Sequence, residues 1–227
     1  RANPISLPFR LPQGPIFIFE GVFAVCQLLP SYRDSAVVQQ GVSYWWIYVC
    51  VMQIAWTMGF AQEQIVLSTV FMYGILVGLV AIVYRTNVLH KAQTYSSWWL
   101  TKAPFTLHLG WIIVATLLSN NVTVVAAGAS PATQLAWAAY TLALLTAIGG
   151  LVVFGRQPDS SILVGVFTWA LGAVASELTD PIDAEQCEDK TGKADGCNML
   201  SEMYAPSITN GLSGACAALS VTMLVIL

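Results

Sequence analysis

His108 is the residue of this chain best suited to hold a metal-containing ligand. It is one of only two histidines, and it lies inside an apolar stretch of the sequence. A neutral imidazole is a good axial ligand for a metal, including haem iron or chlorophyll magnesium, when an acceptor holds its other ring nitrogen. The alternative interpretation is structural: the ring is hydrogen-bonded to a neighbouring helix, or it reaches a polar boundary beside Lys102.

Glu20 is a second ionisable residue within apolar sequence. It could accept hydrogen bonds from Trp or Tyr groups, ligate a metal, or lie in a shallow wet cavity, and the sequence leaves all three open. Gln53 and Trp56 lie three residues apart and therefore share one helical face. With Trp111 and Trp169 they could line a flat hydrophobic ligand. Ordinary packing of buried aromatic residues is the alternative.

Cys187 and Cys197 could form a disulfide, because they lie in the same acidic segment of the chain. Two free thiols are equally compatible with the sequence. A zinc site is disfavoured, since no His is nearby and the pair lacks the usual short ligand spacing.

No arrangement typical of an enzyme is present in the sequence. There is no phosphate-binding loop, pair of midplane carboxylates or metalloprotease motif. Neither His90 nor His108 lies near the strained Ser turn of a hydrolase triad. The net charge of −3 provides no basic face for nucleic acid. We therefore predict a protein that is not an enzyme, has no catalytic residues and does not bind nucleic acid.

The elements that must position these side chains are membrane-spanning helices. Apolar residues make up 56% of the 227 positions and charged residues only 9%, whereas a soluble domain carries about 25% charged residues. Eight of the twelve acidic residues lie between Glu177 and Glu202, which leaves long uncharged stretches elsewhere. These stretches are continuously apolar, so they predict helices, which need about 20 residues to cross a bilayer.

We predict an all-α, polytopic transmembrane bundle of about 6–7 spans. Pro15, Pro104 and Pro206 stand where helices should begin, because proline suits the first helical turn. An acidic loop, residues 178–205, separates the last two spans. The predicted spans are residues 16–30, 41–61, 65–84, 104–126, 132–154, 161–177 and 206–227.

Positive residues near the span ends orient this bundle. Lys and Arg concentrate on the cytoplasmic side of a membrane, or on the stromal side of a thylakoid. We therefore expect the C-terminus on that side and loop 178–205 on the opposite side, where an oxidising compartment would favour the disulfide. The residues that alternate onto the C-terminal side are Arg33, Arg85, Lys91, Lys102 and Arg156.

One predicted helix resembles a known family signature. Residues 103–116, APFTLHLGWIIVAT, resemble a helix of the tryptophan-rich sensory protein and translocator protein (TspO/MBR) superfamily, in its divergent branch. Residues 52–56, 67–84 and 162–172 resemble further helices of this family in the same order. The resemblance covers roughly residues 12–177.

The resemblance implies a compact TspO-like helical bundle, residues 1–177, that binds lipophilic ligands and has no agreed enzymatic mechanism. The ligands it implies are porphyrin, haem or chlorophyll, together with membrane lipids. Three residues depart from the family pattern: His108 stands where the family usually has Tyr, Gln53 where it has Asn, and Glu20 where it tends to have Trp. The identity of the ligand therefore stays open.

A structural, assembly or pigment-carrying subunit of a larger membrane complex is the alternative function. A photosystem–antenna supercomplex in a plastid thylakoid is the case to consider first. Gly74 with Gly78, and Gly211 with Ala215, form small-residue faces that let helices approach closely, within the bundle or against a partner protein. The acidic loop and the C-terminal helix lie outside the resemblance and fit docking on such a partner.

Overall fold

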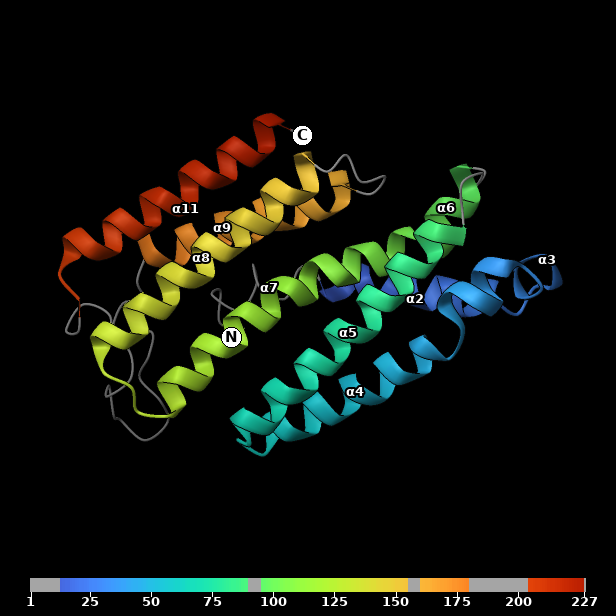
Figure 1. Ribbon diagram of the computed structural model, residues 1–227, viewed down its shortest axis with the longest axis horizontal. Helices are drawn as coiled ribbons and strands as arrows, with labels where there is room; N and C mark the ends of the chain where they lie inside the picture. Colours follow the sequence, from blue (N-terminus) through green and yellow to red (C-terminus); the bar gives the residue numbers. More distant parts are fainter. Residues whose placement is uncertain (1–12, 90–94, 155–159, 180–203, 227) are drawn as a thin grey trace, which may run out of the picture.

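The computed structural model describes residues 13–89, 95–154, 160–179 and 204–226. Within these residues there is no β-strand, which confirms the predicted all-α bundle. Figure 1 shows α7 between the α4–α5 pair and the group formed by α8, α9 and α11. The elements are α2 (Gln13–Cys26), α3 (Pro30–Arg33), η1 (Val37–Val42), α4 (Ser43–Ala61), α5 (Ile65–Leu89), α6 (Tyr95–Thr101), α7 (Ala103–Ala126), α8 (Pro131–Phe154), α9 (Ser160–Thr179) and α11 (Pro206–Ile226).

Each of the seven predicted spans corresponds to one of these helices. Four helices are long and apolar enough to cross a membrane: α5, α7, α8 and residues Ser207–Val225 of α11. Gly14–Cys26 of α2 and Ser161–Ser176 of α9 form shorter apolar helices. Helix α4 has 19 residues and is rich in Tyr and Trp. Apolar side chains such as Leu151 and Phe154 are exposed on the outside of the bundle, where lipid would cover them.

Tight turns join α4 to α5 and α7 to α8. In the first turn Glu63 has φ 59°, and the backbone N–H of Gln64 donates to the carbonyl oxygen of Gly59 at 2.9 Å. In the second turn Gly128 has φ 69°, a conformation that glycine adopts without steric cost. Pro131 then begins α8. Both pairs therefore form antiparallel hairpins, as the short loops in the sequence predict.

Three short elements do not appear in the predicted set of spans. Helix α2 ends at Cys26, and Pro30 instead begins the short helix α3. The π-helix η1 precedes α4, and α6 precedes α7. Helix α6 brings Trp99 against Phe19 of α2, with ring centroids 6.4 Å apart. These elements are too short to cross a bilayer, so a search for apolar spans does not reveal them.

Small residues bring α5 close to α4. A Cβ atom at Gly78 would lie 2.6 Å from Cγ2 of Val49, and one at Gly74 would lie 2.8 Å from Sδ of Met52. The Gly74 and Gly78 face is therefore filled by α4 of the same chain. In the described part of the chain, no atom lies within 4 Å of a Cβ added at Gly211, so that face of α11 is open.

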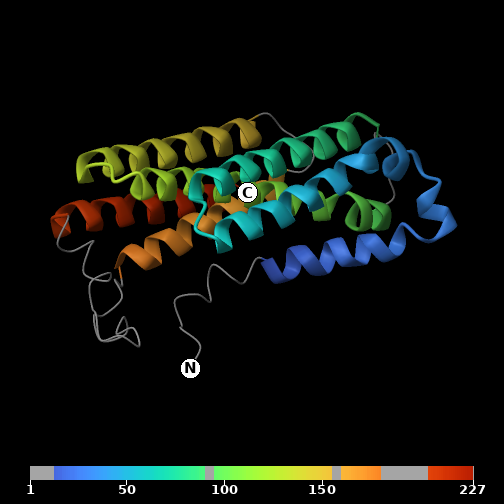
Figure 2. The ribbon, with the colours of Figure 1, turned by 90° about the horizontal axis from the view of Figure 1, so that it is seen from below.

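Helix α11 packs along α9. Ser213 Oγ donates to the carbonyl oxygen of Ala175 at 3.1 Å, and Ser220 Oγ donates to that of Thr168 at 2.9 Å. Such interhelical hydrogen bonds satisfy hydroxyl groups that lipid cannot. In Figure 2, α2 and α8 lie at opposite faces of the bundle. The predicted disulfide residues Cys187 and Cys197, with most of the predicted acidic loop, lie outside the described residues.

Candidate ligand-binding site beside His108

Glu20 of α2 and His108 of α7 form a hydrogen-bonded pair inside the bundle. Nδ1 of His108 lies 2.6 Å from Oε1 of Glu20. The two side chains are only 4% and 11% exposed. An ionisable side chain within a membrane span costs about 2.5–3.5 kcal/mol on insertion scales, and pairing offsets this cost. Each residue therefore supplies the polar partner that the other requires.

Aromatic packing sets the register that makes this pair. Phe23 follows Glu20 by three residues and Phe105 precedes His108 by three, so each helix presents both residues on one face. The rings of Phe23 and Phe105 meet edge to face, with centroids 4.9 Å apart and an interplanar angle of 79°. Both phenylalanines are fully buried. The two contacts pair Glu20 with His108 and Phe23 with Phe105, so residue numbers rise along α2 as they fall along α7. The two helices are therefore antiparallel neighbours.

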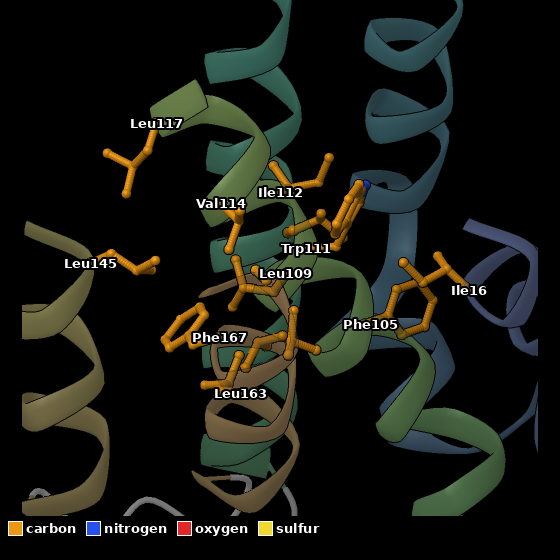
Figure 3. Packing of buried hydrophobic residues seen from close by; sticks show 14 of the residues in the cluster. Ile16, Phe105, Leu109, Trp111, Ile112, Val114, Leu117, Leu145, Leu163 and Phe167 are labelled. Atoms are coloured by element: carbon orange, nitrogen blue, oxygen red, sulfur yellow. The ribbon is translucent and has the colours of Figure 1, made fainter. Parts of the chain in front are cut away.

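The second ring nitrogen of His108, Nε2, makes no hydrogen bond to any of the described residues. His108 lines a cavity of about 320 Å³ together with Gln53, Trp56 and Trp111. Small-molecule sites commonly measure about 300–1,000 Å³, so this volume lies at the lower end of that range. Figure 3 shows Trp111 and Ile112, which both line it, on one side of α7.

The cavity walls are largely apolar and aromatic. Trp56 stacks on Phe60, with ring centroids 5.6 Å apart and an interplanar angle of 25°, and both rings line the cavity. The side-chain amide of Gln53 also lines it and has no hydrogen-bond partner within the described ranges. An unpaired amide in a bilayer is costly.

Trp169 does not line the cavity beside His108. Its ring lies against Trp111, with centroids 5.9 Å apart and a tilt of 56°. It lines a neighbouring cavity of about 570 Å³, together with Phe19 and Trp99. Of the six residues predicted to bind ligand, the structure therefore places four around one cavity, while Glu20 contacts His108 and Trp169 contacts Trp111 without lining that cavity.

His108 is the residue of this cavity wall that could hold a metal-containing ligand. Among the described residues, no group of three or more His, Cys, Asp and Glu side chains could hold a metal ion. His108 could bind the metal of a tetrapyrrole through Nε2, while Glu20 holds the ring and its tautomer through Nδ1.

Sequence reasoning identified Glu20 and His108 separately but missed their contact. It also missed Phe60, Met72 and Ser119, which complete the cavity wall. One signal for this contact was present in the sequence: on each of the two helices, a phenylalanine lies three residues from the ionisable residue. Phe60 follows Trp56 by four residues, so the sequence also predicts that the two residues share one face of the helix.

Fold and site together define a polytopic α-helical membrane protein with a buried carboxylate–imidazole pair beside a lipophilic cavity. Residues 4–184 match the family model of the TSPO-like protein. The chain therefore belongs to the TSPO-like protein family, which confirms the resemblance seen in residues 103–116. The match includes the helices from α2 to α9, and α11 lies beyond it. No curated protein and no solved structure matches the chain.

Proposed function

We propose that this protein is a non-enzymatic membrane protein of the TspO type that binds a tetrapyrrole, such as a porphyrin, haem or chlorophyll, in the cavity beside His108. The observation that carries this proposal is the arrangement of the His108 ring. Its Nδ1 is bonded to Glu20 at 2.6 Å, while its Nε2 has no partner among the described residues and its side chain lines the cavity.

Each residue of the site has a distinct part in binding. Glu20 orients the imidazole and stabilises the tautomer that leaves the Nε2 lone pair free. Trp56 and Trp111 offer apolar surfaces to a flat ring system. Gln53 can donate to, or accept from, a polar substituent at the ligand edge. The bound metal would supply a coordination bond to Nε2, and the protein's contribution is affinity and orientation.

Haem titration of the purified protein in mild detergent tests this proposal. We expect a saturable Soret shift in the wild type. His108→Ala should lower the affinity for haem at least about tenfold, because it removes the ligand of the metal. Added imidazole should restore the spectrum of His108→Ala, because it replaces the missing ligand. Metal-free protoporphyrin should bind without this dependence on His108.

Leu109→Ala provides the matched control. Leu109 is also buried in α7, at 6% exposure, but it does not line the cavity. It should bind haem as the wild type does. If haem gives no saturable shift, or if His108→Ala binds as tightly as Leu109→Ala, the proposal is wrong.

A further inference from the structure

A third cavity lies on the face of α7 opposite the site beside His108. It measures about 490 Å³ and is lined by residues of α7, α8, α9 and α11. Figure 3 shows Val114, Leu117 and Leu145, which line it, on the side of α7 away from Trp111. The two cavities share only Leu118 of α7 among their lining residues. This third cavity is therefore a separate space from the site beside His108.

Helix α11 completes this cavity. Ile208, Leu212 and Cys216 of α11 form part of its wall, and all three lie beyond the family match, which ends at residue 184. Tyr204 precedes α11 and donates through its hydroxyl to the carbonyl oxygen of Pro131 at 2.9 Å. This hydrogen bond ties the start of α11 to the start of α8. The added helix thus creates a pocket that the matched region alone would leave open.

The polar residues of this cavity lie in one half of it. Asn121 is near the end of α7 and Gln134 is near the start of α8, so both lie toward the turn that joins these helices. Tyr204 lies at the same end. The half further from this turn is lined by Val114, Leu145, Ala170, Leu171 and Cys216. The cavity is therefore amphipathic along its length.

Asn121 and Thr141 form a hydrogen-bonding pair with spare capacity. Nδ2 of Asn121 donates to the carbonyl oxygen of Leu117 at 2.9 Å and to Oγ1 of Thr141 at 2.7 Å. Both amide hydrogens are then used, while Oδ1 still accepts nothing from any described residue. The Thr141 hydroxyl accepts from Asn121 and keeps its own hydrogen to donate. One acceptor and one donor thus stand side by side on the cavity wall.

We propose that this cavity binds a long-chain lipophile that ends in one neutral oxygen group, a hydroxyl or a carbonyl. A ligand hydroxyl would donate to Oδ1 of Asn121 and accept from the Thr141 hydroxyl, and a carbonyl would accept from Thr141. The apolar chain would occupy the aliphatic half. None of the described lining residues is Asp, Glu, Lys, Arg or His, so a charged end would have no partner.

Photolabelling of the full-length protein in detergent micelles tests this inference. The probes are a photoreactive long-chain alcohol and the corresponding photoreactive alkane without the hydroxyl. We expect the alcohol to label residues of α8 and α11 that face the cavity. Ala138→Phe should block this labelling, because Ala138 lines the cavity. Ala139→Phe is the matched control, since Ala139 is an exposed neighbour on α8 outside the cavity wall.

Thr141→Val removes the hydroxyl donor with little change in shape. It therefore tests the inference even if the larger substitution, Ala138→Phe, causes misfolding. Loss of one hydrogen bond should weaken labelling by the alcohol about two- to tenfold and leave the alkane unaffected. Labelling that is equal in Ala138→Phe and Ala139→Phe, or equal for alcohol and alkane in the wild type, would overturn the inference.

A third probe distinguishes two sources of the same chemistry. A photoreactive diacylglycerol that labels the same residues would identify the ligand as an uncharged bilayer lipid bound through its hydroxyl or ester carbonyl. Labelling by the alcohol alone would identify a free single-chain lipophile. Photolabelling needs no haem and the haem titration needs no photoprobe, so failure of the proposed tetrapyrrole site and failure of this site are distinguishable.

Discussion

Pairing of two ionisable side chains in a bilayer has a different consequence from pairing at a protein surface. Arg33 and Asp34 also form an ion pair, at 3.2 Å, but their side chains are 62% and 63% exposed. Water competes with such a contact, and it contributes little. The side chains of Glu20 and His108 are shielded from water, so removal of either one leaves the other without this hydrogen-bond partner.

Glu20→Leu should therefore destabilise the protein by about 1–3 kcal/mol, the cost of leaving a buried polar group without a partner. The double variant Glu20→Leu with His108→Leu should recover most of this loss, because apolar residues can replace a buried pair. Unfolding in mixed micelles with increasing SDS measures both effects. A double variant no more stable than Glu20→Leu alone would show that the pair is not the cause.

At the scale of helices, close packing of α4 on α5 depends on glycine. A side chain at Gly78 would collide with Val49, whose branched Cγ2 lies 2.6 Å from the new Cβ. We expect Gly78→Leu to lower stability by about 1–3 kcal/mol through overpacking. Thermal unfolding in detergent provides the measurement.

Gly150→Leu is the control for this prediction. No described atom lies within 4 Å of a Cβ added at Gly150 of α8, so the leucine would enter open space. Both variants replace a glycine within a predicted span by leucine, so they make the same change in composition. Equal melting temperatures for the two would exclude α4–α5 packing as the cause.

Helix bounds were largely predictable because their signals are local. Residues 132–154 were expected as a span and α8 runs from Pro131 to Phe154, since a proline and a preceding glycine turn mark its start. The pairing of Glu20 with His108 was not predictable, because it joins residues 88 positions apart. Apolar periodicity indicates which face of a helix is buried, and in a bilayer nearly every face is apolar. The neighbours of each helix therefore had to come from the structure.

The same limit explains the outcome for the aromatic residues. Trp56 and Trp111 share a cavity although they belong to different helices, whereas Trp169 contacts Trp111 without lining that cavity. Composition alone marks all three as intramembrane tryptophans. Only the packing of α9 on α7 distinguishes Trp111, which lines the cavity, from Trp169, which packs against it.

At the scale of the whole molecule, alternate ends of the helices lie at two opposite sides of the bundle. The α4–α5 turn, the α7–α8 turn and the start of α11 belong to one side in chain order. The other side holds the ends of α5 and α8 and the start of α7. Arg85, at this second side, donates through Nε to the carbonyl oxygen of Gln40 at 2.9 Å, which links α5 to η1. This side also holds the C-terminal end of α11.

Because positive residues favour the cytoplasmic or stromal side, we predict that the C-terminus faces that side. In a bacterial inner membrane, a fluorescent protein fused after Leu227 should fluoresce, since it folds in the cytoplasm. Alkaline phosphatase inserted within residues 178–205 should be active, since it requires the periplasm. The reverse pattern would contradict the orientation while leaving both proposed cavities intact, because neither depends on which side of the membrane is which.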